Sequence, residues 1–234
     1  MRLLAFLLLF SFMSCATIEK QDNLQTALAH FKIGVAYYNE NKIQQAFVEF
    51  QKAYELNPKD KEVLNAIGII YLMHFDEIPK SIVYFEKAVS VDPHYSEAYN
   101  NLGFAYEKSG NFDTAISYYK KAVSNLVYPT PEKAYINMGI SYYRLRKYDL
   151  AIESLKEAIK RAPNLDLPYF KLALCYNALG KYGEASAAMT QAINLDPVYK
   201  GDRGKAVEDL KLRKLNATGY DEQDIRDYLE ILKY

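Results

Sequence analysis

Small residues recur along the chain with a period of 34 to 36 residues. The first small column contains Gly34, Gly68, Gly103, Gly139 and Ala173. The second contains Ala46, Ser81, Ala115, Ala151 and Ala185. Seven residues after each member of the second column stands an alanine, at Ala53, Ala88, Ala122, Ala158 and Ala192. Between the last two columns every copy has a large side chain, at Phe50, Phe85, Tyr119, Leu155 and Met189.

This pattern predicts a stack of helix pairs. Small side chains let two helices approach closely, and the large side chains fill the remaining space between them. Most copies end on a proline, which lacks a backbone N–H and cannot continue a helix, at Pro58, Pro93, Pro163 and Pro197. One pair cannot bury its apolar face alone, whereas stacked pairs form a continuous core. We therefore expect an all-α fold with five pairs, over residues 27–60, 61–95, 96–131, 132–165 and 166–199.

The columns resemble the tetratricopeptide repeat, in five copies over residues 27–199. The resemblance implies a right-handed superhelical solenoid that acts as a protein-interaction scaffold. A further column is interpreted as packing and contains Tyr37, Tyr71, Tyr106, Tyr142 and Tyr176. Residues 200–234 follow the array and are expected to form two helices, which either cap the last repeat or make a degenerate sixth repeat.

Two prolines interrupt the pattern in NLVYPTPEKAYINMG, residues 125–139. Pro129 and Pro131 forbid one continuous helix, and Pro131 suits the first position of a new helix. Thr130 is expected to cap that helix through its hydroxyl. A YPTPE connector leading into AYINMG is similar to the type IV pilus biogenesis and stability lipoproteins, the PilF and PilW family. The stretch YNNLGFAYEKSGNFDTAISYYKKAV, residues 99–123, is also similar to that family's unit before this join.

The N-terminus has the features of an export signal. Arg2 precedes an uncharged apolar run over residues 3–13, which is too short to cross a bilayer core. A small residue before Cys15 resembles the bacterial lipobox, so residues 1–14 are expected to be removed and Cys15 to be lipidated. Residues 15–26 would then form a tether. The alternative is cleavage after Ala16, which would release a soluble periplasmic protein.

A second stripe of residues is expected to form a partner-binding groove. Positions 2, 5, 9 and 12 of each repeat lie roughly 120° round the first helix from the packing stripe, at 100° per residue. Thirteen of these twenty residues are apolar or aromatic, and Lys133 is the one cation, which favours a hydrophobic or amphipathic partner. The proposed groove residues are Phe31, Val35, Tyr38, Ile69, Leu72, Asn100, Phe104, Ile140, Tyr143, Phe170 and Leu174. In the alternative interpretation, the N-terminal tail or the last helix covers part of this face.

Composition and chemistry argue against an enzyme. The 29 basic and 29 acidic residues cancel, so no net field recruits nucleic acid. The three histidines, His30, His74 and His94, stand at no metal-ligand spacing, and no phosphate loop or nucleophile motif is present in the sequence. Cys175 would be the one cysteine besides Cys15, without a disulfide partner. We expect no catalytic residue, metal, cofactor or small-molecule substrate.

The family resemblance implies a periplasm-facing lipoprotein of the bacterial outer membrane that assists type IV pilus biogenesis. Members of that family act as pilotin-like factors, which help secretin subunits to reach the outer membrane and multimerise, or stabilise the fibre. The implied partner is thus a secretin or another pilus-assembly protein. A scaffold of a different envelope or secretion complex is the alternative function.

Cys15→Ser tests the predicted lipid anchor. Acyl chains contribute about 0.8 kcal/mol per buried methylene, and the sequence indicates no other anchor. The variant is expected to fold normally but to move from the membrane pellet to the soluble fraction after a salt wash. Retention in the pellet would contradict lipidation, whereas a soluble wild-type protein beginning at Thr17 would show cleavage after Ala16.

Overall fold

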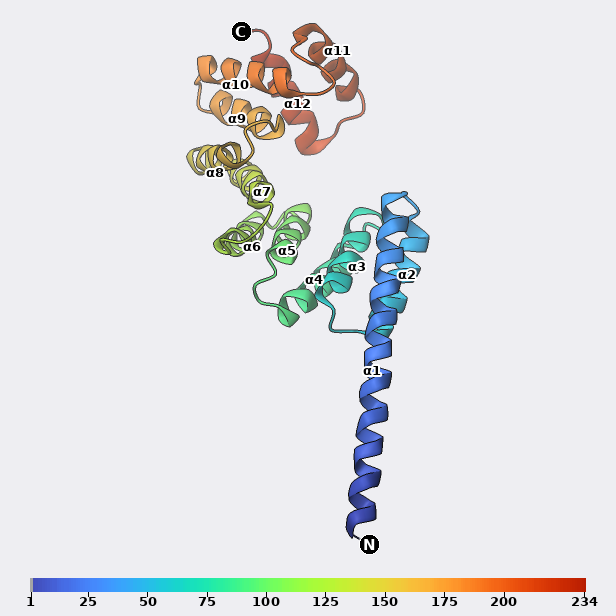
Figure 1. Cartoon of the computed structure of the whole chain (residues 1–234). Helices are drawn as coiled ribbons and strands as arrows, with labels where there is room; N and C mark the ends of the chain where they lie inside the picture. Colours follow the sequence, from blue (N-terminus) through green and yellow to red (C-terminus); the bar gives the residue numbers. More distant parts are fainter. Residues whose placement is uncertain (1) are drawn as a thin grey trace. The chain divides into compact units, whose positions relative to one another are not determined.

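The computed structural model describes the backbone of residues 2–234 and the side chains of residues 21–234. Within this part of the chain it contains twelve helices and no strand, so the expected all-α fold is confirmed (Figure 1). The helices are α1 (Arg2–Asn39), α2 (Ile43–Leu56), α3 (Lys61–Met73), α4 (Ile78–Val91), α5 (Ser96–Lys108), α6 (Phe112–Ser124), α7 (Pro131–Arg144), α8 (Tyr148–Arg161), α9 (Leu167–Ala178), α10 (Tyr182–Leu195), α11 (Arg203–Lys214) and α12 (Gly219–Ile231). The predicted export signal and Cys15 lie outside the residues with described side chains, whereas residues 21–26 of the predicted tether belong to α1 and are exposed.

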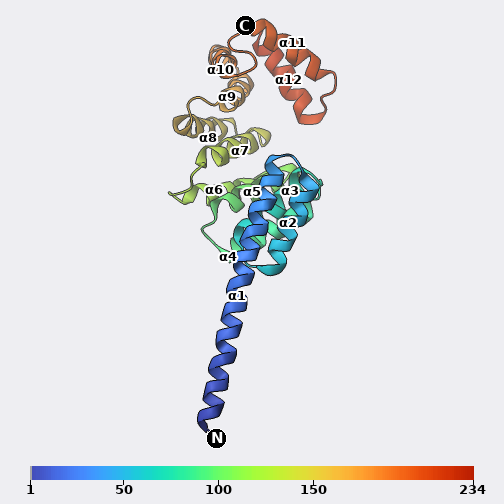
Figure 2. The same cartoon turned by 45° about the vertical axis from the view of Figure 1, so that its right-hand side comes forward.

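The chain divides into two compact units, residues 1–105 and 106–234, and the division falls within α5. In the first unit, α1 packs on α2 and α3 packs on α4. In the second unit, α7 packs on α8 and α9 packs on α10 (Figure 2). Each of these pairs is one predicted repeat, consisting of two antiparallel helices.

The small columns are packing positions, as predicted. All five alanines that end the pattern have no exposed surface, and the large column ranges from 0 to 2% exposed. A Cβ atom added to Gly34 would lie 2.6 Å from the ring of Phe50, and one added to Gly68 would lie 2.5 Å from the ring of Phe85. Real Cβ atoms are not found this close to other heavy atoms, so these positions admit only glycine without repacking. The repeat therefore depends on a large side chain packed directly on a glycine backbone.

The turn inside each repeat is built in the same way. One residue in each turn has a left-handed backbone conformation: Asn41, Asp76, Gly110, Arg146 and Gly180, with φ between 54 and 79°. The next residue donates its N–H to the carbonyl of the tyrosine column, as from Lys42 to Tyr37 at 2.8 Å and from Lys181 to Tyr176 at 2.9 Å. Such a bond satisfies a carbonyl at the helix end, as in a Schellman motif.

The double-proline connector joins α6 to α7 in the second unit. Pro131 is the first residue of α7, as predicted, but the hydroxyl of Thr130 does not cap the helix. The backbone of Thr130 has ψ of 54° instead of the extended value of most capping residues, and its side-chain oxygen is buried without a partner among the described residues. Tyr128 is 5% exposed, whereas Leu126 is 98% exposed. The connector is thus anchored by one inserted tyrosine.

The two C-terminal helices pack on the end of the second unit. Figure 1 shows α12 beside α9 and α10, and both views show α11 beside α12. Ile225, Tyr228 and Ile231 form the buried stripe of α12, at spacings of three and four residues. The two C-terminal helices therefore contact the last repeat, α12 through α9 and α10 and α11 through α10.

Gly139→Ala tests the packing of the glycine column against Gly183→Ala, the same change on an open helix surface. The new Cβ at residue 139 would lie 2.7 Å from Leu155 Cγ and 3.3 Å from the backbone oxygen of Ala151. Such overpacking is expected to lower the free energy of unfolding by about 1–3 kcal/mol. No atom lies within 4 Å of a Cβ at residue 183, so alanine there should raise the free energy of unfolding by about 0.5–1 kcal/mol. Chemical denaturation measures both, and equal effects would refute the packing role.

Candidate functional site

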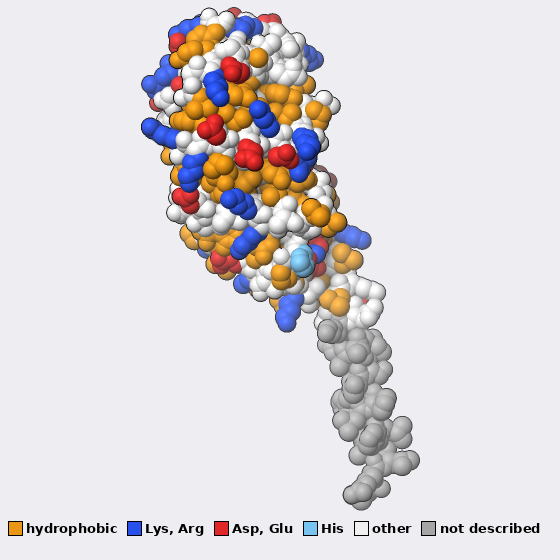
Figure 3. All heavy atoms as spheres, turned by 90° about the vertical axis from the view of Figure 1, so that its left-hand side faces the viewer, with side chains coloured by type: hydrophobic (Ala, Val, Ile, Leu, Met, Phe, Trp, Pro, Cys, Tyr) orange, Lys and Arg blue, Asp and Glu red, His pale blue; other side chains and the backbone are white. Residues whose placement is uncertain are grey.

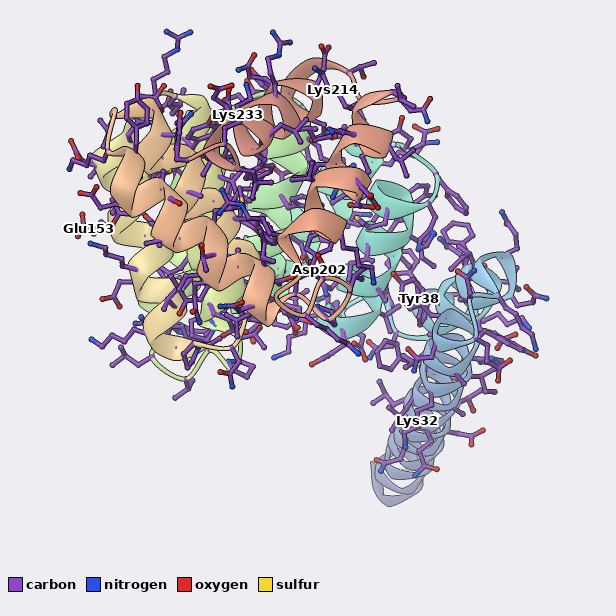
Figure 4. The ribbon with its side chains drawn as sticks, turned by 90° about the horizontal axis from the view of Figure 1, so that it is seen from above. Lys32, Tyr38, Glu153, Asp202, Lys214 and Lys233 are labelled. Atoms are coloured by element: carbon purple, nitrogen blue, oxygen red, sulfur yellow. The ribbon has the colours of Figure 1, made fainter. Side chains whose placement is uncertain are left out.

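The first unit contains an apolar pocket on the predicted groove face, which we call the N-terminal pocket. It has a volume of about 170 Å³ and is lined by Val35, Tyr38, Phe50, Ala66 and Ile69. Val35 and Tyr38 come from α1, and Ile69 comes from α3. These three residues belong to the predicted stripe, so the helical spacing correctly brought them to one place. Figure 4 shows Tyr38 on the C-terminal part of α1.

Rigid aromatic contacts shape the N-terminal pocket. Phe50 is 2% exposed and packs on Phe31, with 5.7 Å between the ring centroids. The ring of Tyr38 meets the ring of His74 edge to face at 5.5 Å, and His74 Nε2 lies 3.3 Å from the Tyr38 hydroxyl. A volume this small lies below the range typical of small-molecule sites. The pocket instead suits one apolar side chain of a protein partner.

The other stripe residues of the first unit are less accessible. Leu72 is 3% exposed and Asn100 is 8% exposed, so neither presents its side chain at the surface. These two residues correct the expectation of an open stripe, because Leu72 in the last turn of α3 and Asn100 in the second turn of α5 are both buried by the surrounding helices. Phe31 and Phe104 are half-buried, as are Tyr37 and Tyr71 of the packing column. Exposure alone therefore does not separate groove aromatics from packing tyrosines.

In the second unit the last helix covers part of the predicted stripe. Phe170 packs edge to face on Tyr228 of α12, with 5.6 Å between the ring centroids, and also contacts Tyr199 at 6.5 Å. Leu174 is 1% exposed, and Ile140 and Tyr143 are half-buried. This arrangement corresponds to the alternative interpretation of the sequence, in which the last helix covers part of the predicted groove face. Binding of a partner by these residues stays a prediction.

A buried ion cluster joins α12 to the repeats. Asp224 of α12 accepts two hydrogen bonds from Arg144 of α7, at 2.6 and 2.8 Å, and one from Lys171 of α9 at 2.8 Å. Asp224 is 3% exposed. Burial raises the pKa of Asp224, but the hydrogen bonds and charges of Arg144 and Lys171 outweigh it, so the pKa lies below its usual value. The cluster therefore holds an ionised carboxylate between two cations.

Sequence reasoning missed this cluster. Asp224 lies 80 residues from Arg144 and 53 from Lys171 along the chain, so no local spacing connects them. Arg144 follows Tyr143 and Lys171 follows Phe170, each one position beyond the stripe that was considered. A wider stripe would have shown both cations on the same side as Lys133, but not the carboxylate that they bind.

Glu107 is a second acidic group on this face of the second unit. Its carboxylate accepts hydrogen bonds from the hydroxyls of Ser141 at 2.8 Å and Tyr119 at 3.1 Å. Burial raises the pKa of Glu107, and these hydrogen bonds and the more distant charge of Arg144 only partly oppose the rise. Two neutral donors stabilise a carboxylate less than the cations at Asp224 do, so the pKa of Glu107 is raised whereas the pKa of Asp224 is lowered.

The described residues hold no group of three His, Cys, Asp or Glu side chains that could bind a metal ion. Cys175 is buried, and burial raises the pKa of its thiol to about 12, so the sulfur is protonated and a poor nucleophile at neutral pH. Among the helices of the described part, none is both long and apolar enough to span a membrane. The face drawn in Figure 3 mixes basic, acidic and hydrophobic side chains.

Three stretches of the chain match family models described as tetratricopeptide repeat: residues 27–60, 94–164 and 136–200. Together with the helix pairs, these matches show that the chain is a tetratricopeptide-repeat protein. Proteins of this class are interaction scaffolds and are generally not enzymes. None of the curated proteins matches the sequence.

Several solved structures share the fold. The structure of PilW, a widely conserved type IV pilus biogenesis factor, gives a TM-score of 0.72 at 22% identity and covers 87% of this chain and 90% of that chain. Pseudomonas aeruginosa PilF gives 0.68 at 18% identity, with coverages of 88% and 98%. The MamA protein gives 0.61 at 26% identity, with coverages of 73% and 92%. For PilW and PilF, identities this low establish similarity of fold.

Glu107→Gln tests whether burial raises the pKa of the Glu107 carboxyl group. An unfolded glutamate has a pKa of about 4.3, and the folded pKa of Glu107 is higher. Its contribution to stability is therefore fully present below about pH 4.3 and is lost as the pH rises through the folded pKa. Glutamine keeps an acceptor for Ser141 and Tyr119 but does not titrate. The unfolding free energy of the variant, relative to wild type, should rise as the pH increases from about 4.3 through the folded pKa of Glu107.

Glu153→Gln is the matched control, because Glu153 projects from the outer side of α8 (Figure 4). Denaturant unfolding at several pH values should show the same pH dependence for this control as for wild type. A Glu107→Gln curve that stays parallel to wild type would show that burial does not perturb this carboxyl.

Proposed function

We propose that this protein is a lipid-anchored scaffold of type IV pilus assembly that faces the periplasm from the outer membrane. The N-terminal pocket carries the proposal, because an apolar pocket between α1, α2 and α3 suits an anchoring side chain of a protein partner. Two further observations support it. The fold is similar to PilW, described as a type IV pilus biogenesis factor, and the sequence contains the YPTPE connector and an N-terminal stretch with the features of an export signal.

In this proposal the first unit captures a secretin or another pilus-assembly protein. Val35, Tyr38 and Ile69 would surround one apolar or aromatic side chain of the partner, and Phe50 would form the floor. Burying such a side chain contributes about 1.5–3 kcal/mol. Lipidated Cys15 would hold the scaffold at the outer membrane, and a soluble periplasmic protein is the alternative.

A scaffold of another envelope complex is the second candidate. The sequence identity to MamA is 26%, compared with 22% to PilW, so sequence identity does not favour a pilus protein over other tetratricopeptide-repeat proteins. The fold accommodates either assembly, since a repeat array supplies a surface whose partner is selected by individual side chains.

Val35→Asp tests the pocket, with Val48→Asp as the matched control. Val35 lines the pocket, whereas Val48 on α2 is 50% exposed and is not one of the lining residues. A carboxylate in the pocket should cost about 2 kcal/mol or more of binding free energy, because an apolar partner side chain would desolvate it. In a strain lacking the gene, wild type and Val48→Asp should restore secretin multimers and surface pili, whereas Val35→Asp should not.

Thermal melting of the purified variants checks that both remain folded. Normal pili in the deletion strain would refute the pilus proposal. Equal rescue by Val35→Asp and Val48→Asp would instead show that the pocket is not the binding site.

A further inference from the structure

Helix α12 is held in the second unit by the carboxylate of Asp224, by an apolar stripe and by contacts near both of its ends. Tyr220 packs on Phe112, and the carbonyl of Leu232 accepts a hydrogen bond from Arg203 at 2.7 Å. Asp224 lies between Arg144 and Lys171, and Tyr228, four residues later, packs on Phe170. Tyr228 is 8% exposed and Ile231 is fully buried. Because Phe170 belongs to the predicted groove stripe, α12 occupies the place where the stripe would meet a partner.

The two cations make this groove selective for an acidic occupant. Arg144 and Lys171 have side chains only 10% and 15% exposed, so removal of Asp224 would leave two poorly solvated positive charges. Glu107 is engaged by Tyr119 and Ser141. An apolar helix could cap the array without any charge, whereas an occupant that lacks a carboxylate would leave the two buried cations uncompensated.

The fit of α12 to the groove is incomplete. A cavity of about 160 Å³ remains beside the ion cluster, and its lining includes Phe170, Lys171, Asp224 and Tyr228. Side chains at the edge of such a space lose the dispersion contacts that a filled interface would provide. A helix with a bulkier side chain at this point would make contacts that α12 does not make.

The connection of α12 to the rest of the chain allows it to leave. Residues 215–218 link it to α11, and Gly219 at its start has a φ of 58°. Leu215 in this linker is 78% exposed. Since each repeat is stabilised by contact with its neighbours, departure of the terminal helix leaves the pairs α7–α8 and α9–α10 intact.

We propose that α12 is an internal occupant of a second binding groove, and that a partner helix displaces it. The partner's helix carries a carboxylate one turn before an aromatic side chain, which reproduces the Asp224 and Tyr228 contacts. This inference deepens the scaffold function proposed above and rests on it. The second unit then opens only to a partner of this chemistry, because an occupant without a carboxylate leaves Arg144 and Lys171 uncompensated.

A fluorescein-labelled peptide with the sequence of residues 218–234 tests the proposal by fluorescence anisotropy with the full-length chain. Asp224→Asn in the chain weakens the internal competitor and raises the fraction of open groove. This variant should therefore bind the peptide at least about tenfold more tightly than wild type does. Asp227→Asn is the matched control, because Asp227 bonds Gln223 on the same helix, and it should bind the peptide like wild type.

The peptide itself carries a second control. A peptide with D224N should bind the Asp224→Asn chain at least about tenfold more weakly than the unmodified peptide, because it cannot compensate Arg144 and Lys171. Equal affinities of the two peptides, or equal affinities of Asp224→Asn and wild-type chains, would overturn the proposal. A dimeric Asp224→Asn chain in light scattering would also overturn it, since α12 would then be exchanged between copies.

Should Asp224→Asn fail to fold, the wild-type chain still decides the matter. With the chain labelled with nitrogen-15 and the peptide unlabelled, excess peptide should shift the amide signals of the chain's own α12 to those of a free helix. Unchanged α12 signals at saturating peptide would show that α12 is a permanent cap of the array and would overturn the proposal. Piliation of the deletion strain tests the pilus-scaffold function, whereas the peptide experiments test the displacement of α12. Failure of one proposal can therefore be distinguished from failure of the other.

Discussion

The structure depends on the contact between a glycine in the first helix of a repeat and a large side chain in the second. Phe50 on Gly34, Phe85 on Gly68 and Leu155 on Gly139 all approach closer than any Cβ would allow. This contact sets the distance between the two helices, and the buried alanine columns complete it. Because one stripe of each first helix is committed to this packing, the stripe roughly 120° away is free for other contacts.

The two units use that remaining stripe in different ways. In the first unit, Val35, Tyr38 and Ile69 leave an apolar pocket whose floor is the same Phe50 that packs on Gly34. In the second unit, α12 lies on the stripe, and the ion cluster around Asp224 specifies which helix can do so. The N-terminal pocket thus selects a partner by shape and apolar burial. The site of α12 in the second unit instead selects an occupant that compensates two cations.

The abundance of tyrosine follows from the half-buried positions that helix pairs create. Tyr71 and Tyr84 stack with 5.5 Å between their centroids, and Lys80 and Lys87 lie over these rings at 5.5 and 4.8 Å. The ring buries apolar surface between helices, while its edge and hydroxyl stay accessible and its face attracts a lysine. Tyrosine therefore serves packing and surface together, which is why exposure does not distinguish groove aromatics from packing ones.

The sequence by itself determined the helix pairs, their spacing and the packing columns, because these depend on residues 7 to 20 positions apart and repeat five times. Helical periodicity also brought Val35, Tyr38 and Ile69 to one face. Only the tertiary structure decided that Leu72 and Asn100 are buried, that Thr130 does not cap α7, and that α12 returns to α9. Those outcomes depend on contacts between repeats and on contacts between residues far apart in the chain. Arg144 and Asp224, for example, are 80 residues apart, so no local sequence pattern connects them. A periodic pattern reports the environment that every repeat shares, whereas the end of an array has a neighbour on one side only, and its contacts are set by the particular side chains that meet there.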